Sequence, residues 1–176
     1  PTVKWAFTSF YAGNWHPLTW ITHMVDYQLF RLNPAGHHFI NVLFHAANAG
    51  LLFILLLRLT GGLWPSAFVA ALFAWHPLHV ESVAWIAELK NTLSLPLLLL
   101  AACAYLDYEE SGRRSRYWAS LTWFLGSLLC KTSGVMLPVG TVLFPYVSHA
   151  LDGSQFQALE AVFTATVGYG LYALIA

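Results

Sequence analysis

Residues 37–59 read HHFINVLFHAANAGLLFILLLRL, and this stretch decides the fold. With a rise of about 1.5 Å per residue, a helix of this length crosses the roughly 30 Å hydrocarbon core of a bilayer. The sequence therefore predicts that residues 37–59 form a membrane-spanning helix.

One face of this predicted helix is polar. Four residues follow one another at steps of three, four and three and fall within an arc of roughly 80°: His38, Asn41, His45 and Asn48. Lipid offers no partner to an imidazole or an amide, so the stripe should face the bundle interior or a water-filled cavity. Two interpretations stay open: hydrogen bonds that hold neighbouring helices together, or the wall of a polar substrate cavity.

The composition agrees with a membrane environment. The chain is 58% hydrophobic and 9% charged, whereas a soluble domain carries about 25% charged residues. This predicts an integral, multi-pass membrane protein. The net charge is +0, so no overall field would attract nucleic acid, and we expect no such partner. Cys103 and Cys130 lie in or at the ends of apolar runs, where we expect neither a disulfide nor redox chemistry.

The N-terminal part, residues 1–36, is expected to form an extracytosolic loop with one amphipathic helix. From Pro17 to Leu32, apolar residues recur at helical spacing, opposite Thr19, Thr22, His23 and Asp26. Such a helix would lie at the membrane surface or pack on its own domain. Residues 33–36 predict a turn.

The remainder, residues 37–176, is expected to contribute about five to six membrane helices to one partial membrane domain, the last helix cut by the chain end. Thr60-Gly61-Gly62 ends the first span, and residues 63–75 are long enough to cross only if extended to about Val80. Residues 92–108 predict the third crossing, with Pro96 in its first turn.

The second half of the chain is less regular. The charged residues between Asp107 and Arg116 predict an exposed loop. Residues 117–130 and 135–147 predict two short helices that meet at Lys131, in preference to one kinked helix. The arginines at 113, 114 and 116 predict a cytoplasmic side, which Arg58 would share.

A polar island separates two apolar runs: Trp75-His76-Pro77-Leu78-His79-Val80-Glu81, followed by residues 82–90. Ionisable groups are costly at membrane depth, so their density suggests a working site. His76, His79, Lys90 and Lys131 all lie at the ends of apolar runs on one predicted side. Such donors suit the phosphate of a lipid-linked sugar, with the apolar tail between helices. For Lys131, snorkelling to the interface is an equal alternative.

Two further patterns involve histidines. Trp-His-Pro-Leu occurs at residues 15–18 and 75–78, each time before a helical stretch, so the copies could frame one site or simply serve as helix starts. His76, His79 and Glu81 carry metal-ligating groups, but Pro77 interrupts the turn and no fourth ligand is evident. We therefore expect neither a metal site nor haem.

Three longer motifs make a family resemblance specific: WAFTSFYAGNWHPLTWITHMVDYQLFRLNPAGHHFINVLFHAANA, then ALFAWHPLHVESVAWIAELKNTLS, then SLLCK. From Trp5 to about Pro138 the chain resembles the membrane part of the tetratricopeptide-repeat protein O-mannosyltransferase family and its bacterial relatives. The resemblance implies an all-α, polytopic transmembrane bundle of the GT-C glycosyltransferase type. It also implies transfer of a sugar, expected to be mannose, from a polyprenyl-phosphate donor to a serine or threonine hydroxyl of a protein. The membrane would be the bacterial inner membrane or the endoplasmic reticulum, with no cofactor besides the donor lipid.

The chain also departs from the family pattern. Where the family has Glu-Arg-Lys-Asp after Val83-Ala84-Trp85, this chain has Glu88-Leu89-Lys90-Asn91, with one cation and one carboxylate fewer. The resemblance further places the family's catalytic acidic pair before Pro1, so we expect a fragment. Its substitute carboxylates would be Asp26 or Glu81, together with Glu88. The alternative is a non-catalytic membrane module that binds lipid phosphate or a partner helix; a metal transporter ranks third.

Overall fold

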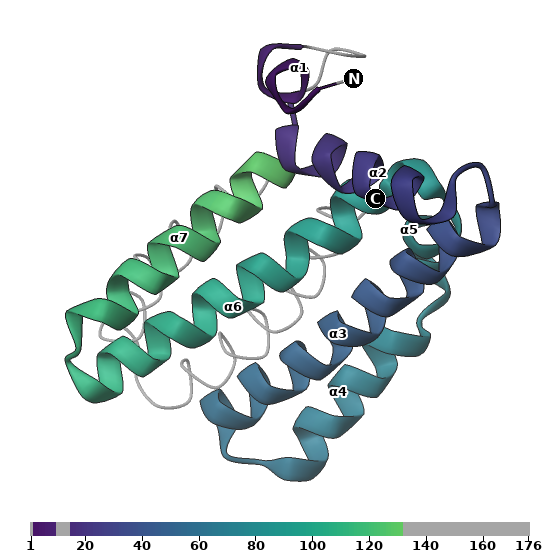
Figure 1. Ribbon diagram of the computed structural model, residues 1–176. Coiled ribbons are helices and arrows are strands. Elements are labelled where there is room, and N and C mark those ends of the chain that lie inside the picture. Colours follow the sequence, from purple (N-terminus) through teal and green to yellow (C-terminus); the bar gives the residue numbers. More distant parts are fainter. Residues whose placement is uncertain (1, 10–14, 132–176) are drawn as a thin grey trace.

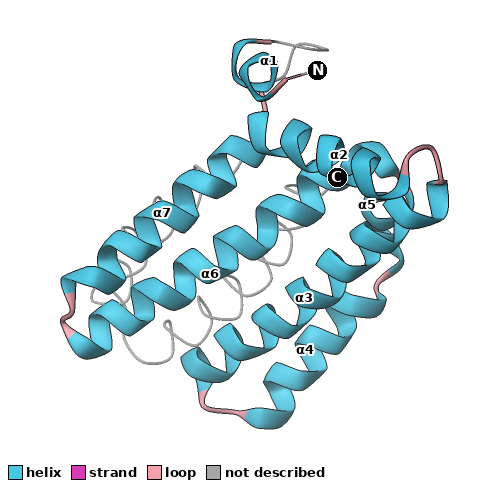
Figure 2. Ribbon diagram, viewed as in Figure 1, coloured by secondary structure: helices cyan, strands magenta, loops and turns pink. Residues whose placement is uncertain are grey.

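The computed structural model describes residues 2–9 and 15–131. Within these ranges every regular element is a helix and the connections are short (Figure 2). The prediction of an all-α fold is confirmed.

The elements follow one another in a simple order. They are α1 (Val3–Thr8), α2 (Pro17–Phe30), α3 (Pro34–Thr60), α4 (Leu63–Trp75), the 3₁₀ turn η1 (Pro77–His79), α5 (Val80–Ala84), the 3₁₀ turn η2 (Ile86–Glu88), α6 (Leu89–Ser111) and α7 (Arg114–Cys130). Helices α4, α3, α6 and α7 lie side by side, and α2 crosses one end of the bundle (Figure 1).

The long helices meet through leucines. Leu52 of α3 packs with Leu95 and Leu99 of α6 in a small buried core, to which Phe73 of α4 adds its ring. Polar contacts join α6 to α7, where Ser127 Oγ donates to the Ser94 carbonyl oxygen at 3.0 Å.

Two helices are long and apolar enough to cross a membrane: Pro34–Thr60 and Ile86–Ser111. A third crossing is possible if Leu63–Trp75 and Pro77–Ala84, bent by 48° at their junction, form one broken span. Large apolar side chains such as Phe39, Trp64, Phe68 and Trp118 are exposed on the bundle, which suits contact with lipid. The protein is an integral membrane protein, as predicted.

Three sequence predictions need correction. The predicted turn at residues 33–36 is the start of α3, because Asn33 caps the helix through its side chain and Pro34 fits a first helical position. The charged stretch 107–116 is exposed but mostly helical, since only Gly112 and Arg113 separate α6 from α7. Helix α6 begins at Leu89, so Pro96 lies inside it and not in its first turn.

Helix α2 has about the predicted length, but its polar face is more buried than its apolar face. Thr19 and Asp26 on the polar face are buried, whereas Val25 and Leu29 on the apolar face are exposed. Thr19 Oγ1 donates to the Cys130 carbonyl oxygen, at the end of α7, at 3.2 Å. The polar face thus packs on the bundle and leaves the apolar face available for lipid, as an interfacial helix requires.

Helix α7 ends at Cys130, and Lys131 adopts an extended backbone (φ −156°, ψ 129°). This end fits the first of the two helices predicted between residues 117 and 147. The second helix, the final apolar run and the total of five to six crossings lie outside the described residues.

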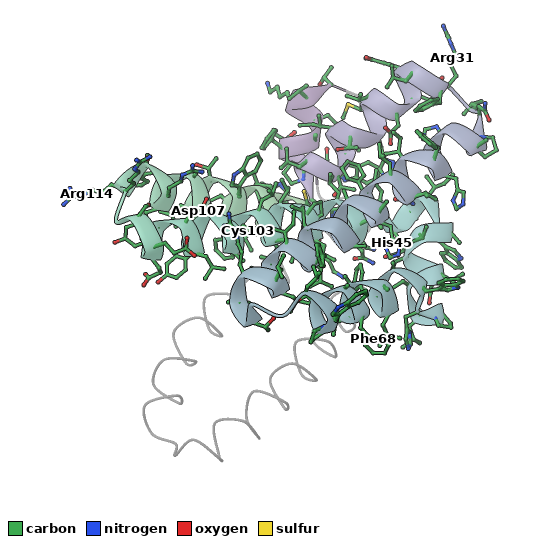
Figure 3. All side chains as sticks on the ribbon, turned by 90° about the horizontal axis from the view of Figure 1, so that it is seen from below. Arg31, His45, Phe68, Cys103, Asp107 and Arg114 are labelled. Carbon is green, nitrogen blue, oxygen red and sulfur yellow. The ribbon has the colours of Figure 1, made fainter. Side chains whose placement is uncertain are left out.

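The arginines gather at one end of the bundle. Arg58 of α3 and Arg116 of α7 both pair with Asp107 of α6, at 2.5 and 3.3 Å. We call this the arginine end. Figure 3 shows Asp107 and Arg114 there, with His45 and Arg31 toward the opposite part of the molecule. Arg58 does share a side with residues 113–116, as predicted.

Candidate functional site

The opposite end of the bundle, here called the island end, comprises α2, residues 76–91 and Lys131. Most of the residues singled out from the sequence lie here. Their positions depend on the polar stripe of α3, whose side chains form hydrogen bonds with backbone carbonyl oxygens at the ends and interruptions of neighbouring helices.

Asn41 reaches the end of α5. Its Nδ2 donates to the Trp85 carbonyl oxygen at 3.0 Å, and its Oδ1 accepts from Thr92 Oγ1 at 2.8 Å. Asn41 is fully buried. Both halves of the amide are therefore used to hold the polar island against α3 and α6.

His45 reaches the end of α4. Its Nε2 lies 3.1 Å from the Ala74 carbonyl oxygen, and since a carbonyl only accepts, Nε2 carries the proton in this contact. The His45 ring also stacks on Phe73 and contacts His79, with ring centroids 5.3 and 5.7 Å apart. His79 in turn contacts His76 at 6.2 Å.

Asn48 reaches an interruption inside α6. Pro96 has no N–H, so the Thr92 carbonyl four residues earlier has no helical donor. Asn48 Nδ2 donates to that oxygen at 3.0 Å. The stripe therefore satisfies backbone carbonyls that ends and breaks of helices leave open.

The structure places the four stripe residues in different surroundings. A cavity of about 10 Å³ is lined by His45, Asn48, Phe73, His79, Ser82, Asn91, Thr92 and Leu95. This volume corresponds to about one water molecule. Asn41 is taken up by interhelical hydrogen bonds, and His38 is exposed. Interhelical hydrogen bonds thus account for Asn41, His45 and Asn48. His45 and Asn48 also line the small cavity, and the wall of a substrate cavity stays a prediction for the stripe.

A chain of contacts joins the two lysines of the predicted phosphate site. Lys131 Nζ donates to Asn91 Oδ1 at 2.7 Å, and Asn91 Nδ2 donates to Glu88 Oε2 at 2.6 Å. The other Glu88 oxygen pairs with Lys90 Nζ at 3.2 Å. Residues 40 positions apart thereby meet at one buried amide.

The contact chain from Lys131 through Asn91 and Glu88 to Lys90 contains two positive charges and one negative charge. Burial lowers the pKa of Lys131, and the Lys90 ammonium lowers it further, with Glu88 acting in the opposite direction. Burial also lowers the pKa of His16, the histidine of the first Trp-His-Pro-Leu motif, and Lys90 adds to that shift. An added anion would relieve this repulsion.

The four predicted phosphate-binding residues therefore lie at the same end, in two connected groups. Lys90 and Lys131 belong to the contact chain, and His79 and His76 belong to the histidine cluster. Asn91 and His79 both line the small cavity. The histidines of the two Trp-His-Pro-Leu copies have different surroundings. The pKa of His16 is lowered in part by the charge of Lys90, whereas His76 Nδ1 accepts from the Leu78 N–H at 3.3 Å.

Two of the candidate catalytic carboxylates, Glu81 and Asp26, occupy different environments. Glu81 is exposed on α5. Asp26 is buried on α2, and burial raises its pKa, with His37 acting in the opposite direction. Neither belongs to the lysine contact chain, whose carboxylate is Glu88. Within residues 2–9 and 15–131, no three histidine, cysteine or acidic side chains lie together as a metal site would require.

Sequence reasoning missed the central role of Asn91. It is 1% exposed although it stands in the polar island. A partial signal was present, because Glu88 and Asn91 lie three residues apart at the start of a helix. The contact with Lys131 has no local signal.

Comparisons with known proteins agree with the resemblance. The chain is 35% identical over 153 residues to human protein O-mannosyl-transferase TMTC2, covering 81% of this chain and 18% of that protein. It is 30% identical over 171 residues to human TMTC4, covering 85% and 22%. With Drosophila melanogaster Tmtc1 the identity is 32% over 127 residues, covering 70% and 14%.

The chain therefore spans about a fifth of the length of the human relatives. No family model matches it, and no solved structure matches it significantly.

Proposed function

This chain matches a segment of the TMTC family of protein O-mannosyl-transferases, and we propose that it contributes the phosphate-binding end of a membrane glycosyltransferase. The donor would be a polyprenyl-phosphate sugar, expected to be mannose, and the acceptor a serine or threonine hydroxyl of a protein. The host membrane, bacterial inner membrane or endoplasmic reticulum, stays a prediction.

The observation that carries this proposal is the coupling of Lys90 and Lys131 through Glu88 and Asn91. The Lys90 ammonium pairs with Glu88, and the Lys131 ammonium is linked to the same carboxylate through Asn91. This contact chain lies at the end of a helix bundle that exposes apolar surface. A lipid phosphate has matching chemistry, since its charged head can meet the lysines while its tail follows the apolar helices.

The proposed chemistry assigns the lysines a defined role. In sugar transfer, an acceptor oxygen bonds to the anomeric carbon while the bond from that carbon to the phosphate oxygen breaks. Cations beside the phosphate stabilise the charge that develops on it. The acceptor hydroxyl must also lose its proton to a base, for which Asp26 and Glu81 are this chain's candidates.

Sugar transfer tests the proposal. Membranes containing a full-length version of the protein would be given polyprenyl-phosphate mannose with a labelled sugar and a serine- and threonine-containing peptide. We expect labelled peptide. The Lys131→Ala variant should transfer the sugar about 10- to 100-fold more slowly, because a hydrogen bond to a charged group contributes about 1.5–3 kcal/mol. Glu81→Gln should lower the rate as well if Glu81 is the base.

Arg114→Ala is the matched control because it removes a cation from the arginine end. Transfer that is unchanged in Lys131→Ala would remove Lys131 from the site. Lipid-phosphate binding without any transfer would instead support the non-catalytic membrane module.

A further inference from the structure

Asn41 and Asn48 lie two turns apart on α3 and resemble each other closely. Both are buried, at 0% and 1% exposure. Both donate through Nδ2 to a backbone carbonyl oxygen at 3.0 Å. They differ in the other half of the amide, because Asn41 Oδ1 accepts from Thr92 Oγ1, whereas Asn48 Oδ1 has no hydrogen-bond partner among the described residues.

The orientation of the Asn48 amide follows from its known contact. Thr92 offers a carbonyl oxygen, which can only accept, so Nδ2 must face Thr92 and Oδ1 must point elsewhere. Exchanging the two atoms would bring two acceptors together. The amide therefore keeps a buried acceptor that no described residue satisfies, and Asn48 is one of the residues that line the small cavity.

That cavity fits one small polar guest. Its volume of about 10 Å³ corresponds to about one water molecule, and its wall includes His79, Ser82 and Asn91 besides Asn48. A buried water needs two to four polar partners, and the wall of this cavity carries polar side chains from α3, the island and α6. A purely apolar guest would leave Asn48 Oδ1 unsatisfied.

We propose that this cavity binds one ordered water molecule that donates a hydrogen bond to Asn48 Oδ1 and bridges α3 to the polar island. With this water, the side-chain oxygens of both asparagines would accept a hydrogen bond. Thr92 supplies the donor for Asn41, and the water supplies the donor for Asn48. The inference is independent of any sugar or phosphate bound at the lysines.

Solid-state NMR on the full 176-residue chain in lipid bilayers tests this proposal. With uniform ¹⁵N labelling, magnetisation would be transferred from water protons to side-chain nitrogens, and the build-up compared at the two amides. We expect transfer at Asn48 Nδ2 several-fold stronger than at Asn41 Nδ2. Equal transfer at both amides, or no transfer at Asn48, would overturn the proposal.

A pair of variants gives an independent readout at the His79 ring. Asn48→Leu should abolish the transfer from bound water to His79, and Asn41→Leu should leave it in place. Retention of the His79 signal in Asn48→Leu would contradict the proposed position of the water. If either variant fails to fold, the comparison of Asn41 and Asn48 in the unaltered chain still decides the question.

Discussion

Asn48 Nδ2 donates a 3.0 Å hydrogen bond to the Thr92 carbonyl oxygen, the carbonyl that Pro96 leaves without a helical donor. A side chain of α3 thus supplies the hydrogen-bond donor that a backbone carbonyl of α6 lacks. The same logic applies to His45 at Ala74 and to Asn41 at Trp85. The polar stripe of α3 is therefore best understood as the support that fixes the island end.

The first prediction concerns the hydrogen bond from Asn48 to the Thr92 carbonyl oxygen. Asn48→Leu should destabilise the protein by about 1–3 kcal/mol because it leaves a buried carbonyl unpaired. In a Pro96→Ala background the new N–H can bond to Thr92, so the same substitution should cost less. Denaturant unfolding in detergent micelles measures the coupling in a double-mutant cycle.

Ser120→Ala provides the control, since Ser120 Oγ bonds to the Ala101 carbonyl oxygen at 2.9 Å, away from Pro96. The loss in free energy of unfolding caused by Ser120→Ala should be the same with proline and with alanine at position 96. If Asn48→Leu lowers the free energy of unfolding equally with proline and with alanine at position 96, Asn48 does not replace the missing donor to the Thr92 carbonyl.

A second prediction concerns Asn91. Asn91→Leu keeps the charges but breaks the contacts to Lys131 and Glu88, so lipid-phosphate affinity should fall about 10-fold with its salt dependence retained. Asn91→Asp adds a carboxylate beside Glu88 and cancels the surplus positive charge, so affinity and salt dependence should both fall. Binding titrations at several salt concentrations distinguish the two effects; identical behaviour of the variants would argue against charge as the cause.

A third prediction uses the pKa of His16, which burial and then Lys90 lower below the ordinary value of about 6.5. Lys90→Gln should raise this pKa, but burial should still keep it below the ordinary value. An NMR titration of the His16 imidazole measures the shift. Arg114→Gln removes a cation at the arginine end and should leave the titration unchanged.

The same shift has a consequence for stability. Because the unfolded chain protonates His16 at a higher pH than the folded protein does, His16 lowers stability as the pH falls from about 6.5 toward the folded pKa. The loss in that window should be smaller in Lys90→Gln. A larger loss in the variant would mean that Lys90 does not act on His16 through its charge.

A fourth prediction concerns the arginine end. Asp107→Asn removes both ion pairs, to Arg58 and Arg116. Since these side chains are partly exposed, the loss should be modest, about 1 kcal/mol or less. Thermal unfolding in detergent at low and high salt checks it, with Glu110→Gln as a control of equal charge change. A loss of the same size in Glu110→Gln would show that net charge, not pairing, is responsible.

The sequence predicted the membrane helices well because hydropathy and length report directly on burial in lipid. Residues 37–59 form most of α3, and residues 92–108 lie within α6. The start of α6 was misplaced because Leu89 to Asn91 are polar on average, yet they are helical and largely enclosed by the bundle. Tertiary packing decided that boundary.

The stripe shows the limit of periodicity. The 80° arc correctly grouped four residues, but it cannot tell how far a neighbouring helix covers them. His38 lies at one edge of the arc and is exposed, while Asn41 and Asn48 lie near the other edge and are buried. The meeting of Lys131 with Asn91 depends on the path of α6 and α7 and has no local sequence signal.

Equilibrium binding of a radiolabelled polyprenyl phosphate to the chain in lipid nanodiscs tests the phosphate site most directly. The Lys90→Gln/Lys131→Gln variant should bind at least about 100-fold more weakly than the unaltered chain, from about 1.5–3 kcal/mol at each lysine. The Arg113→Gln/Arg114→Gln variant loses the same charge at the other end and should bind normally. Equal affinity in both double variants would contradict a phosphate site at Lys90 and Lys131.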